Sequence, residues 1–194
     1  MAEKNIVTFV FFGIVGSGKG TQVKLLQEHL EKRGEQVAYI GTGEIFRKNP
    51  EIKEMIKEIL NRGQLVPDAV TNQVVREALS AESDLANKNI VFDGYPRTVP
   101  QAAEFEKMIQ KYDRNEIKII YIELSETEAM RRNLLRGRHD DTEAGLKQRF
   151  AEYRNKVVPA MEYFRGKPGY EILTINGEQT IENVHQDILK NLKI

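Results

Sequence analysis

The sequence lacks several features that assign whole classes of protein. It contains no cysteine and only three histidines among 194 residues. This excludes a disulfide scaffold and a thiolate zinc site, and it leaves few ligands for any other metal cage. We therefore expect no structural zinc. The missing cysteine also fits a reducing compartment, so we expect a cytoplasmic protein.

An excess of charge of one sign is also absent. Lys and Arg together number 29, as do Asp and Glu, so no overall basic field exists to attract a polyanion. Long apolar runs are missing as well, because residues 6–15 are interrupted by Thr8 and Gly13 and fall short of the roughly 20 residues of a spanning helix. We expect no nucleic-acid partner, no membrane partner and no secretory signal, since a lysine-bearing glycine loop follows the run.

What is present is the composition of an ordinary globular protein, with 40% hydrophobic and 30% charged residues. This length suits one domain that carries small insertions. We expect a monomer in which residues 1–194 form a single domain.

Strand and helix signals alternate along the chain. Residues 6–12 are rich in Val, Ile and Phe, which is typical of a parallel strand buried on both faces. A glycine loop follows at 13–20, and then a helical pattern that ends at Gly34. Further strand signals lie at 36–40, 89–92, 116–124 and 170–175. This order predicts an α/β fold with a five-stranded parallel sheet flanked by helices.

Helical patterns also occupy the stretch between the second and third strand signals. They lie at 51–61 and from Pro67 to about residue 81, and they predict a small helical insertion. Ser125 and Glu128 have the spacing of a capping box, which predicts a helix that runs to Arg136. After a loop at 137–141 we expect a long helix to about residue 165, kinked or restarted by Pro159, and an amphipathic closing helix over 181–192.

A glycine-rich segment carries the strongest chemical signal. Residues 13–19 read G-I-V-G-S-G-K and fit the phosphate-binding pattern G-x-x-x-x-G-K, with Gly20 inserted before the hydroxyl residue Thr21. Such glycines let backbone N–H groups surround phosphate oxygens, the next helix directs its positive end at them, and Lys19 adds a mobile charge. We expect Thr21 to face a magnesium-bound phosphate.

A second signal follows the third predicted strand. Residues 90–93 end in Asp93, a carboxylate placed to hold magnesium through water. The turn after it, Gly94-Tyr95-Pro96-Arg97-Thr98, presents an arginine fork at the edge where parallel sheets bind nucleotides. Two phosphate-seeking groups, Lys19 and Arg97, are therefore expected at one edge of the sheet.

With these motifs the chain resembles the adenylate kinases, a branch of the nucleoside monophosphate kinases, over nearly its whole length. Residues 13–22 are similar to that family's phosphate loop. Thr42-Gly43-Glu44 with Arg47 resembles its monophosphate site, where the acid is more usually aspartate, and Gln64-Leu65-Val66-Pro67 resembles the segment that lines the acceptor base. Residues 93–98 with Gln101, and the C-terminal set Arg132, Arg136, Arg138, Asp140, Asp141 and Arg149, also follow the family's order.

The resemblance implies a P-loop kinase that reversibly transfers a phosphoryl group from ATP to AMP, gives two ADP and uses Mg²⁺. The donor phosphates would be held by Gly16, Ser17, Gly18, Lys19, Gly20 and Thr21, with Asp93 and Thr21 near the metal. AMP would be held by Thr42, Arg47, Gln64, Leu65, Val66, Gly94, Tyr95, Pro96, Arg97 and Gln101. Arg132 would cover the donor adenine, Gln179 would touch that base, and Arg136, Arg138 and Arg149 would lie along the transferring phosphoryl group. The acceptor-binding insertion would cover 41–67 and the lid 136–141.

The implied lid is very short. Only Gly137 separates Arg136 from Arg138, so this loop can cover little of a triphosphate, and we expect water to be excluded incompletely.

Several alternatives stay open from the residues. A pyrimidine (UMP/CMP) monophosphate kinase would share the loop and the arginines, although Thr42, Thr98 and Gln101 favour AMP, and a nucleotide sensor without catalysis is a further possibility. Asp140 and Asp141 could complement the positive end of the next helix or contact an arginine. Arg132 and Arg136 lie four residues apart and could simply form a solvated helix face.

Overall fold

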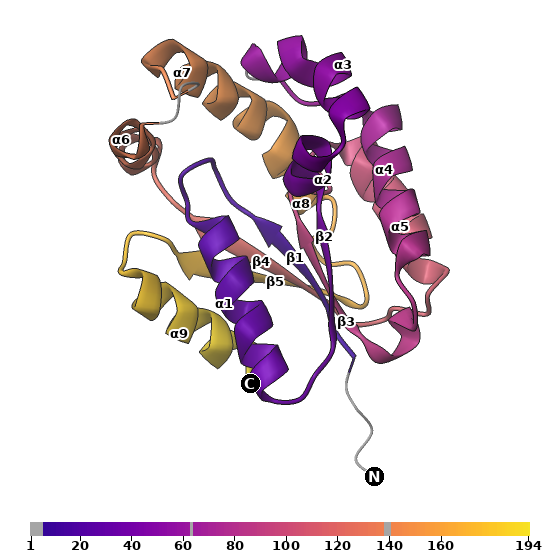
Figure 1. Ribbon diagram of the computed structural model, residues 1–194. Coiled ribbons are helices and arrows are strands. Elements are labelled where there is room, and N and C mark those ends of the chain that lie inside the picture. The colour runs from indigo at the N-terminus through magenta and orange to yellow at the C-terminus, as the bar shows by residue number, and fades with distance from the viewer. Residues whose placement is uncertain (1–5, 63, 138–140) are drawn as a thin grey trace.

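A five-stranded parallel sheet forms the centre of the protein. The computed structural model describes residues 6–62, 64–137 and 141–194, and its strands are ordered β2-β3-β1-β4-β5 (Figure 1). The strands are β1 (Thr8–Phe12), β2 (Val37–Gly41), β3 (Asn89–Asp93), β4 (Ile117–Glu123) and β5 (Tyr170–Asn176). Every pairing between neighbours is parallel. The predicted α/β fold with five parallel strands is therefore confirmed.

Helices cover both faces of this sheet, which explains why the central strand β1 is buried along its whole length (Figure 1). Phe9 and Phe11 of β1 point to one face, where α1 (Lys19–Lys32) and α9 (Ile181–Leu192) bury them. Val10 and Phe12 point to the opposite face, which is covered by α4 (Asp68–Ala81), α5 (Val99–Gln110) and α8 (Val158–Glu162). The alternation of side chains along a strand thus builds two cores from a single apolar run.

The region between β2 and α4 has a small core of its own. It contains α2 (Thr42–Lys48) and α3 (Pro50–Asn61), and Phe46, Ile56, Val66 and Val74 pack together there, apart from the two cores on the sheet. The helical patterns at 51–61 and after Pro67 are confirmed as α3 and α4. The seven-residue α2 was not predicted, since Gly43 makes its sequence a poor helix former.

The capping box predicted for α6 (Glu126–Arg136) is half wrong. The Ser125 hydroxyl does accept from the Glu128 backbone N–H, as the pattern predicts. The Glu128 carboxylate does not return to Ser125, because it accepts charge-assisted hydrogen bonds from Arg131 and Arg132 (2.7 Å each). Glu178, 53 residues further along the chain, takes its place and accepts from the Ser125 N–H (3.3 Å).

The long helix predicted up to about residue 165 is divided in the structure. It consists of α7 (Glu143–Glu152), a π-helical turn at Tyr153–Val157 and α8, which has Pro159 in its first turn. The sequence predicts a kink or a restart at Pro159, and the structure has a π-helical turn just before the proline, with helical backbone angles kept at Glu152, Val157 and Val158. A short 3₁₀ helix at Leu85–Asn87 precedes β3. Among the described residues, none of these helices combines the length and apolarity that crossing a bilayer requires.

Candidate active site

The predicted site residues leave the sheet at one common edge. In the strand register Phe11 of β1 lies beside Asp93 of β3, and Asp93 lies beside Gly41 of β2. The glycine loop after β1, Thr42 after β2 and the turn at 94–98 after β3 therefore start from the same level. This is the carboxyl edge of a parallel sheet, where open α/β folds bind ligands. Figure 1 shows α2 and α3 on one side of this edge and α6 and α7 on the other.

The loop between β1 and α1 has the backbone of an anion-binding turn. Gly16 and Gly18 have φ values of +89° and +88°, a left-handed conformation that favours glycine. The cap of α1 at Gly18 makes no side-chain hydrogen bond, so no side chain competes for the N–H groups of the first turn. Ser17 is buried and its hydroxyl has no hydrogen-bond partner among the described residues. Both features leave donors available for phosphate oxygens.

Lys19 folds back over this loop. Its ammonium group donates to the carbonyl oxygens of Gly13 and Ile14, the latter at 3.1 Å. Burial lowers the pKa of Lys19 to about 8, Asp93 opposes this effect, and Arg97 and Arg136 add to it. The lysine is therefore a poorly compensated cation, and an incoming phosphate would supply the missing negative charge.

Asp93 and Thr21 offer oxygen ligands of the kind that magnesium prefers. Asp93 is half-buried at the end of β3 and accepts from the Tyr39 hydroxyl (3.5 Å), whereas Thr21 is exposed on the first turn of α1. Mg²⁺ is commonly bound by one or two carboxylates together with waters and substrate phosphates, not by a cage made only of protein. A single carboxylate with a hydroxyl beside a phosphate loop fits that donor set. Within the described ranges no group of three or more His, Asp or Glu could hold a metal ion.

Arg97 is held by a chain of hydrogen bonds that starts on α4. Its Nε donates to the Gly94 carbonyl (2.7 Å), and its backbone N–H donates to Oε1 of Gln101 (2.8 Å). The Gln101 amide in turn donates to Asp68 (2.8 Å). Burial is the main cause of a lowered pKa for Arg97, partly opposed by Asp93. Thr42 joins this chain of hydrogen bonds, because its hydroxyl donates to the same Gly94 carbonyl as Arg97 (3.0 Å).

Tyr95 and Pro96 form the floor of this turn. Both side chains are buried, and the Tyr95 hydroxyl donates to Asn72 of α4 (2.8 Å). The Tyr95–Pro96 peptide bond is cis. The hydrogen bond from Tyr95 to Asn72 attaches the turn at 94–97 to α4 and so fixes the backbone position of Arg97.

Asp141 joins two of the arginines expected along the phosphoryl group. Its fully buried carboxylate lies 2.9 Å from Arg136 and 3.3 Å from Arg149. The cap of α7 is Thr142, whose hydroxyl accepts from Gly145 N–H (3.1 Å). Of the two roles open for Asp141, the structure shows the contact with arginines. Arg138 and Asp140 lie outside the described residues.

Arg132 and Gln179 meet at a different place, the loop between β5 and α9. Arg132 pairs with Glu128 and donates to the Gly177 carbonyl (2.9 Å). Gln179 donates to the Asn176 carbonyl (3.0 Å) and to Asp187 (2.8 Å). Both residues predicted near the donor base thus border one loop.

The residues of the insertion that are predicted to hold AMP, Arg47 at its phosphate and Gln64, Leu65 and Val66 at its base, differ widely in exposure. Arg47 is exposed on α2, and Gln64 is exposed before α4. Leu65 is half-buried, and Val66 is buried in the small core with Val74. All four belong to the insertion expected at 41–67.

Sequence reasoning missed two polar residues that hold the site together, the half-buried Asp68 and the buried Asn133. Asp68 accepts from both Thr98 (3.0 Å) and Gln101. Asn133 of α6 donates to the Val15 carbonyl of the glycine loop (3.0 Å) and accepts from Arg136 (2.5 Å). The position of Asn133 inside an otherwise good helix was an available signal, because asparagine is a weak helix former.

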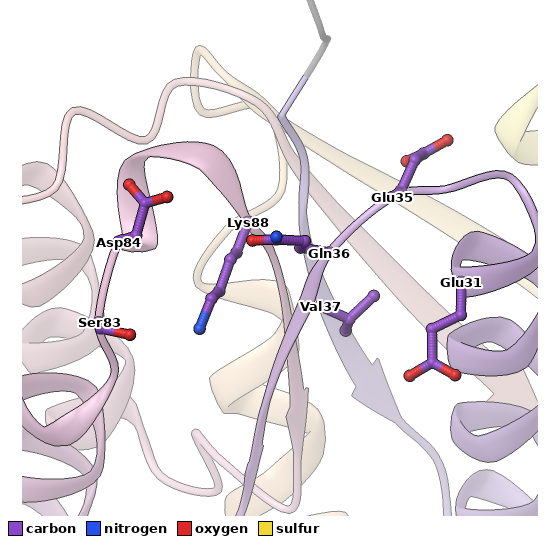
Figure 2. A pocket seen from close by; sticks show the side chains of 7 residues that line it. All are labelled: Glu31, Glu35, Gln36, Val37, Ser83, Asp84 and Lys88. Carbon is purple, nitrogen blue, oxygen red and sulfur yellow. The ribbon is translucent and has the colours of Figure 1, made fainter.

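A hollow of about 600 Å³ lies at the opposite, amino-terminal edge of the sheet. Figure 2 shows that its walls come from the end of α1, the start of β2 and the connection before β3. The carboxylates of Glu31, Glu35 and Asp84 line it, and the ammonium of Lys88 is paired with Glu82 (3.0 Å). This charge repels phosphates, so the hollow does not compete with the glycine loop as a nucleotide site.

The parallel sheet with a glycine loop leading from β1 into α1 defines a P-loop nucleotide-binding fold. The family model described as adenylate kinase matches residues 11–168. Among curated proteins, the adenylate kinase of Corynebacterium urealyticum is 35% identical over 93% of this chain and 96% of its own. Adenylate kinase 1 of a Nostoc species is 33% identical over 94% and 97% of the two chains, and the Bacteroides fragilis adenylate kinase is 33% identical over 95% and 97%. The chain therefore belongs to the adenylate kinase family of enzymes.

Proposed function

We propose that this protein transfers the γ-phosphoryl group of MgATP to AMP, reversibly, to give two ADP. The observation that supports it most directly is the gathering of positive charge beside the glycine loop. Lys19 interacts with Arg97 and Arg136, Arg97 interacts with Arg149, and Asp141 bridges Arg136 and Arg149. Cations this close together repel one another, and phosphates are their natural counter-ions.

In the proposed reaction the protein contributes position and charge rather than a base. A phosphate oxygen of AMP is already a nucleophile, so no proton needs to be removed from it. Lys19 and the arginines would balance the negative charge that spreads over the transferring group. Thr21 and Asp93 would hold Mg²⁺, which would supply positive charge against the negative charge of the phosphates. Phosphates would also compete with Asp141 for Arg136 and Arg149.

The two sides of the sheet edge would divide the substrates. The loop at 16–21, with Arg132 and Gln179, would hold ATP, while the insertion at 41–67, with Arg97 and Gln101, would hold AMP. The loop at 136–141 would act as a short lid that carries Arg136 and Arg138. The separate small core of the insertion supports its treatment as a unit that can move against the sheet.

The hydrogen bonds already made by Thr42 and Gln101 support AMP as the acceptor. The Thr42 hydroxyl donates its one hydrogen to the Gly94 carbonyl, so towards a bound base it can act only as a hydrogen-bond acceptor. Gln101 uses Oε1 for Arg97 and one amide hydrogen for Asp68, so one donor hydrogen remains. An acceptor beside a donor matches the amino group and ring nitrogen of adenine. A guanine or uracil bound in the same orientation would direct its carbonyl at the Thr42 acceptor and its N–H at the Gln101 donor.

The test is a nucleotide assay in which ATP is offered with AMP, GMP, UMP, CMP or dTMP. We expect AMP to exceed GMP and UMP by at least about 100-fold in kcat/KM, because the wrong base leaves polar groups unpaired. CMP shares the edge of adenine and should be rejected by size alone, by roughly tenfold or more. Equal use of UMP and AMP would contradict the proposal and favour a pyrimidine monophosphate kinase. Thr42→Val, which removes the acceptor at constant volume, should narrow the gap between AMP and GMP.

A further inference from the structure

One buried amide on α6 connects the glycine loop to an arginine of the proposed transfer site. Asn133 is 0% exposed. Its Nδ2 donates to the Val15 carbonyl of the loop (3.0 Å) and to the Ala129 carbonyl of its own helix (2.6 Å). Its Oδ1 accepts from Nη2 of Arg136 (2.5 Å). The side chain therefore has both kinds of hydrogen-bonding atom engaged, and two of its three partners belong to the proposed site.

The choice of asparagine at this position is costly for the helix. Asparagine is a weaker helix former than leucine, and burying an amide costs free energy unless every polar atom finds a partner. Ala129, one of the partners of Asn133, belongs to an apolar cluster with Ile14, Leu146 and Phe150, and Val15 packs against that cluster. The hydrogen bonds to Val15 and Arg136 are what compensate for the amide here.

The bond to Val15 controls the direction of the next backbone N–H. The peptide unit that joins Val15 to Gly16 is planar, and in a trans peptide its C=O and N–H point in opposite directions. When Asn133 holds the Val15 carbonyl towards α6, the Gly16 N–H points away from α6. A β-carbon on Gly16 would lie 2.3 Å from Nδ2 of Asn133, so the amide is packed directly against this glycine.

The bond to Arg136 fixes the second donor. Its guanidinium lies between Oδ1 of Asn133 and the carboxylate of Asp141 (2.9 Å). A planar guanidinium held by two acceptors has a defined plane as well as a defined position.

We propose that Asn133 is a positioning residue for phosphoryl transfer, which fixes the Gly16 N–H and the Arg136 guanidinium relative to each other through one amide. The inference rests on the proposed function, because it assigns phosphate contacts to both groups. Donors that are already oriented stabilise developing charge without rearranging during the reaction. Asn133 itself touches no reacting atom and acts through its two partners.

The first test replaces the amide by an apolar group of similar size. Asn133→Leu should lower kcat about 30-fold with a smaller change in the KM for AMP, because the Gly16 N–H and Arg136 act on the donor phosphates and the transferring group and not on the AMP base. Asn89→Leu is the matched control. Asn89 is also buried, accepts from Val7 N–H (2.8 Å) and donates to Glu35 (2.8 Å), but it lies at the other end of the strands. The Asn89→Leu variant should be less stable than the wild type, while its kcat should stay within about twofold of the wild-type value.

A double-mutant cycle separates positioning from general damage. If Asn133 works partly through Arg136, then Asn133→Leu should cost only about threefold in kcat when Arg136 is already alanine. Equal losses in both backgrounds, or a loss no larger than that of Asn89→Leu, would overturn the inference. The dissociation constant of MgADP, measured by calorimetry on the same four proteins, should show the same lack of additivity. That binding cycle decides the inference even if the wild-type protein fails to convert ATP and AMP, a result that would count against the proposed function alone.

Discussion

Lys19 should give the proposed reaction an alkaline limit well below that of an ordinary lysine. Burial is the main reason that its pKa falls from 10.5 to about 8, with Arg97 and Arg136 acting in the same direction and Asp93 against it. The free protein therefore carries the Lys19 charge below about pH 8 and loses it above. Because kcat/KM reports the ionisation of the free enzyme, the loss of charge should appear there.

The size of this effect follows from the titration. A lysine with a pKa of about 8 is about 90% protonated at pH 7 and about 10% protonated at pH 9, so kcat/KM for ATP should fall about tenfold over this range. Bound phosphates favour the charged form and raise the pKa again, so kcat at saturating ATP should change by less than about twofold. Tyr39, which contacts Asp93, has its pKa raised by burial to about 12 and stays protonated throughout.

The assay measures ADP by chromatography in quenched samples, which avoids the pH limits of coupling enzymes. Lys19→Arg is the control, because a guanidinium keeps its charge to pH values above 12. That variant should be slower at every pH but should lack the fall between pH 7 and 9. A wild-type kcat/KM that stays level to pH 10 would refute the argument. The same fall in Lys19→Arg would assign the titration to another group.

Further expectations concern stability, the arginine fork and the lid. Lys19→Met should raise the free energy of unfolding at pH 7 by about 1–2 kcal/mol while it abolishes transfer, since a lysine with a lowered pKa destabilises the fold when charged. Between pH 8 and 10.5 the Lys19 side chain is neutral in the folded wild type and takes up a proton on unfolding, so the wild type becomes more stable as the pH rises. Its urea midpoint should therefore approach that of Lys19→Met. A difference between the two midpoints that does not change with pH would argue against the burial of this charge. Arg97→Lys keeps the charge but loses the planar fork, so in steady-state assays the KM for AMP should rise and kcat should fall, each by about tenfold or more. Unchanged values would show that Arg97 has only a structural role. Only residues 137–142 connect α6 to α7, so phosphate should be released from ATP without AMP, and when AMP is present Arg47→Ala, which cannot seat the acceptor, should release more phosphate than the wild type. Release as slow as that of an adenylate kinase with a full lid domain would show that the site is sealed by other means.

The sheet, its flanking helices and the glycine loop could be predicted because each rests on a contiguous pattern. The apolar run before Gly13 and the spacing of Val23, Leu26 and Leu30 are local signals, and they led to β1 and α1 with bounds correct within two residues. The seven-residue α2 could not be predicted in this way. Its stability comes from Phe46 packing into the small core with Ile56 and Val66, which no local pattern reveals.

The supporting residues of the site escaped prediction for a similar reason. Asn133 meets Val15 across 118 residues of chain, and Glu178 reaches Ser125 across 53. A capping pattern indicates that an acid should stand near Ser125 but cannot show that Glu128 will prefer neighbouring arginines. Asp141 had two physically reasonable partners in sequence, a helix N-terminus and an arginine, and the positions of Arg136 on α6 and Arg149 on α7 decide between them.

The central claim is tested most directly by ³¹P NMR of the purified protein with MgATP and AMP in equal amounts. The account predicts that the ATP and AMP signals decline together, that two ADP form for each ATP consumed, and that little free phosphate appears. Lys19→Ala should slow this conversion about a thousandfold while it remains folded, because one preorganised charge in such a site is worth about 3–4 kcal/mol. Unchanged ATP and AMP signals, or conversion at the same rate by Lys19→Ala, would contradict the account.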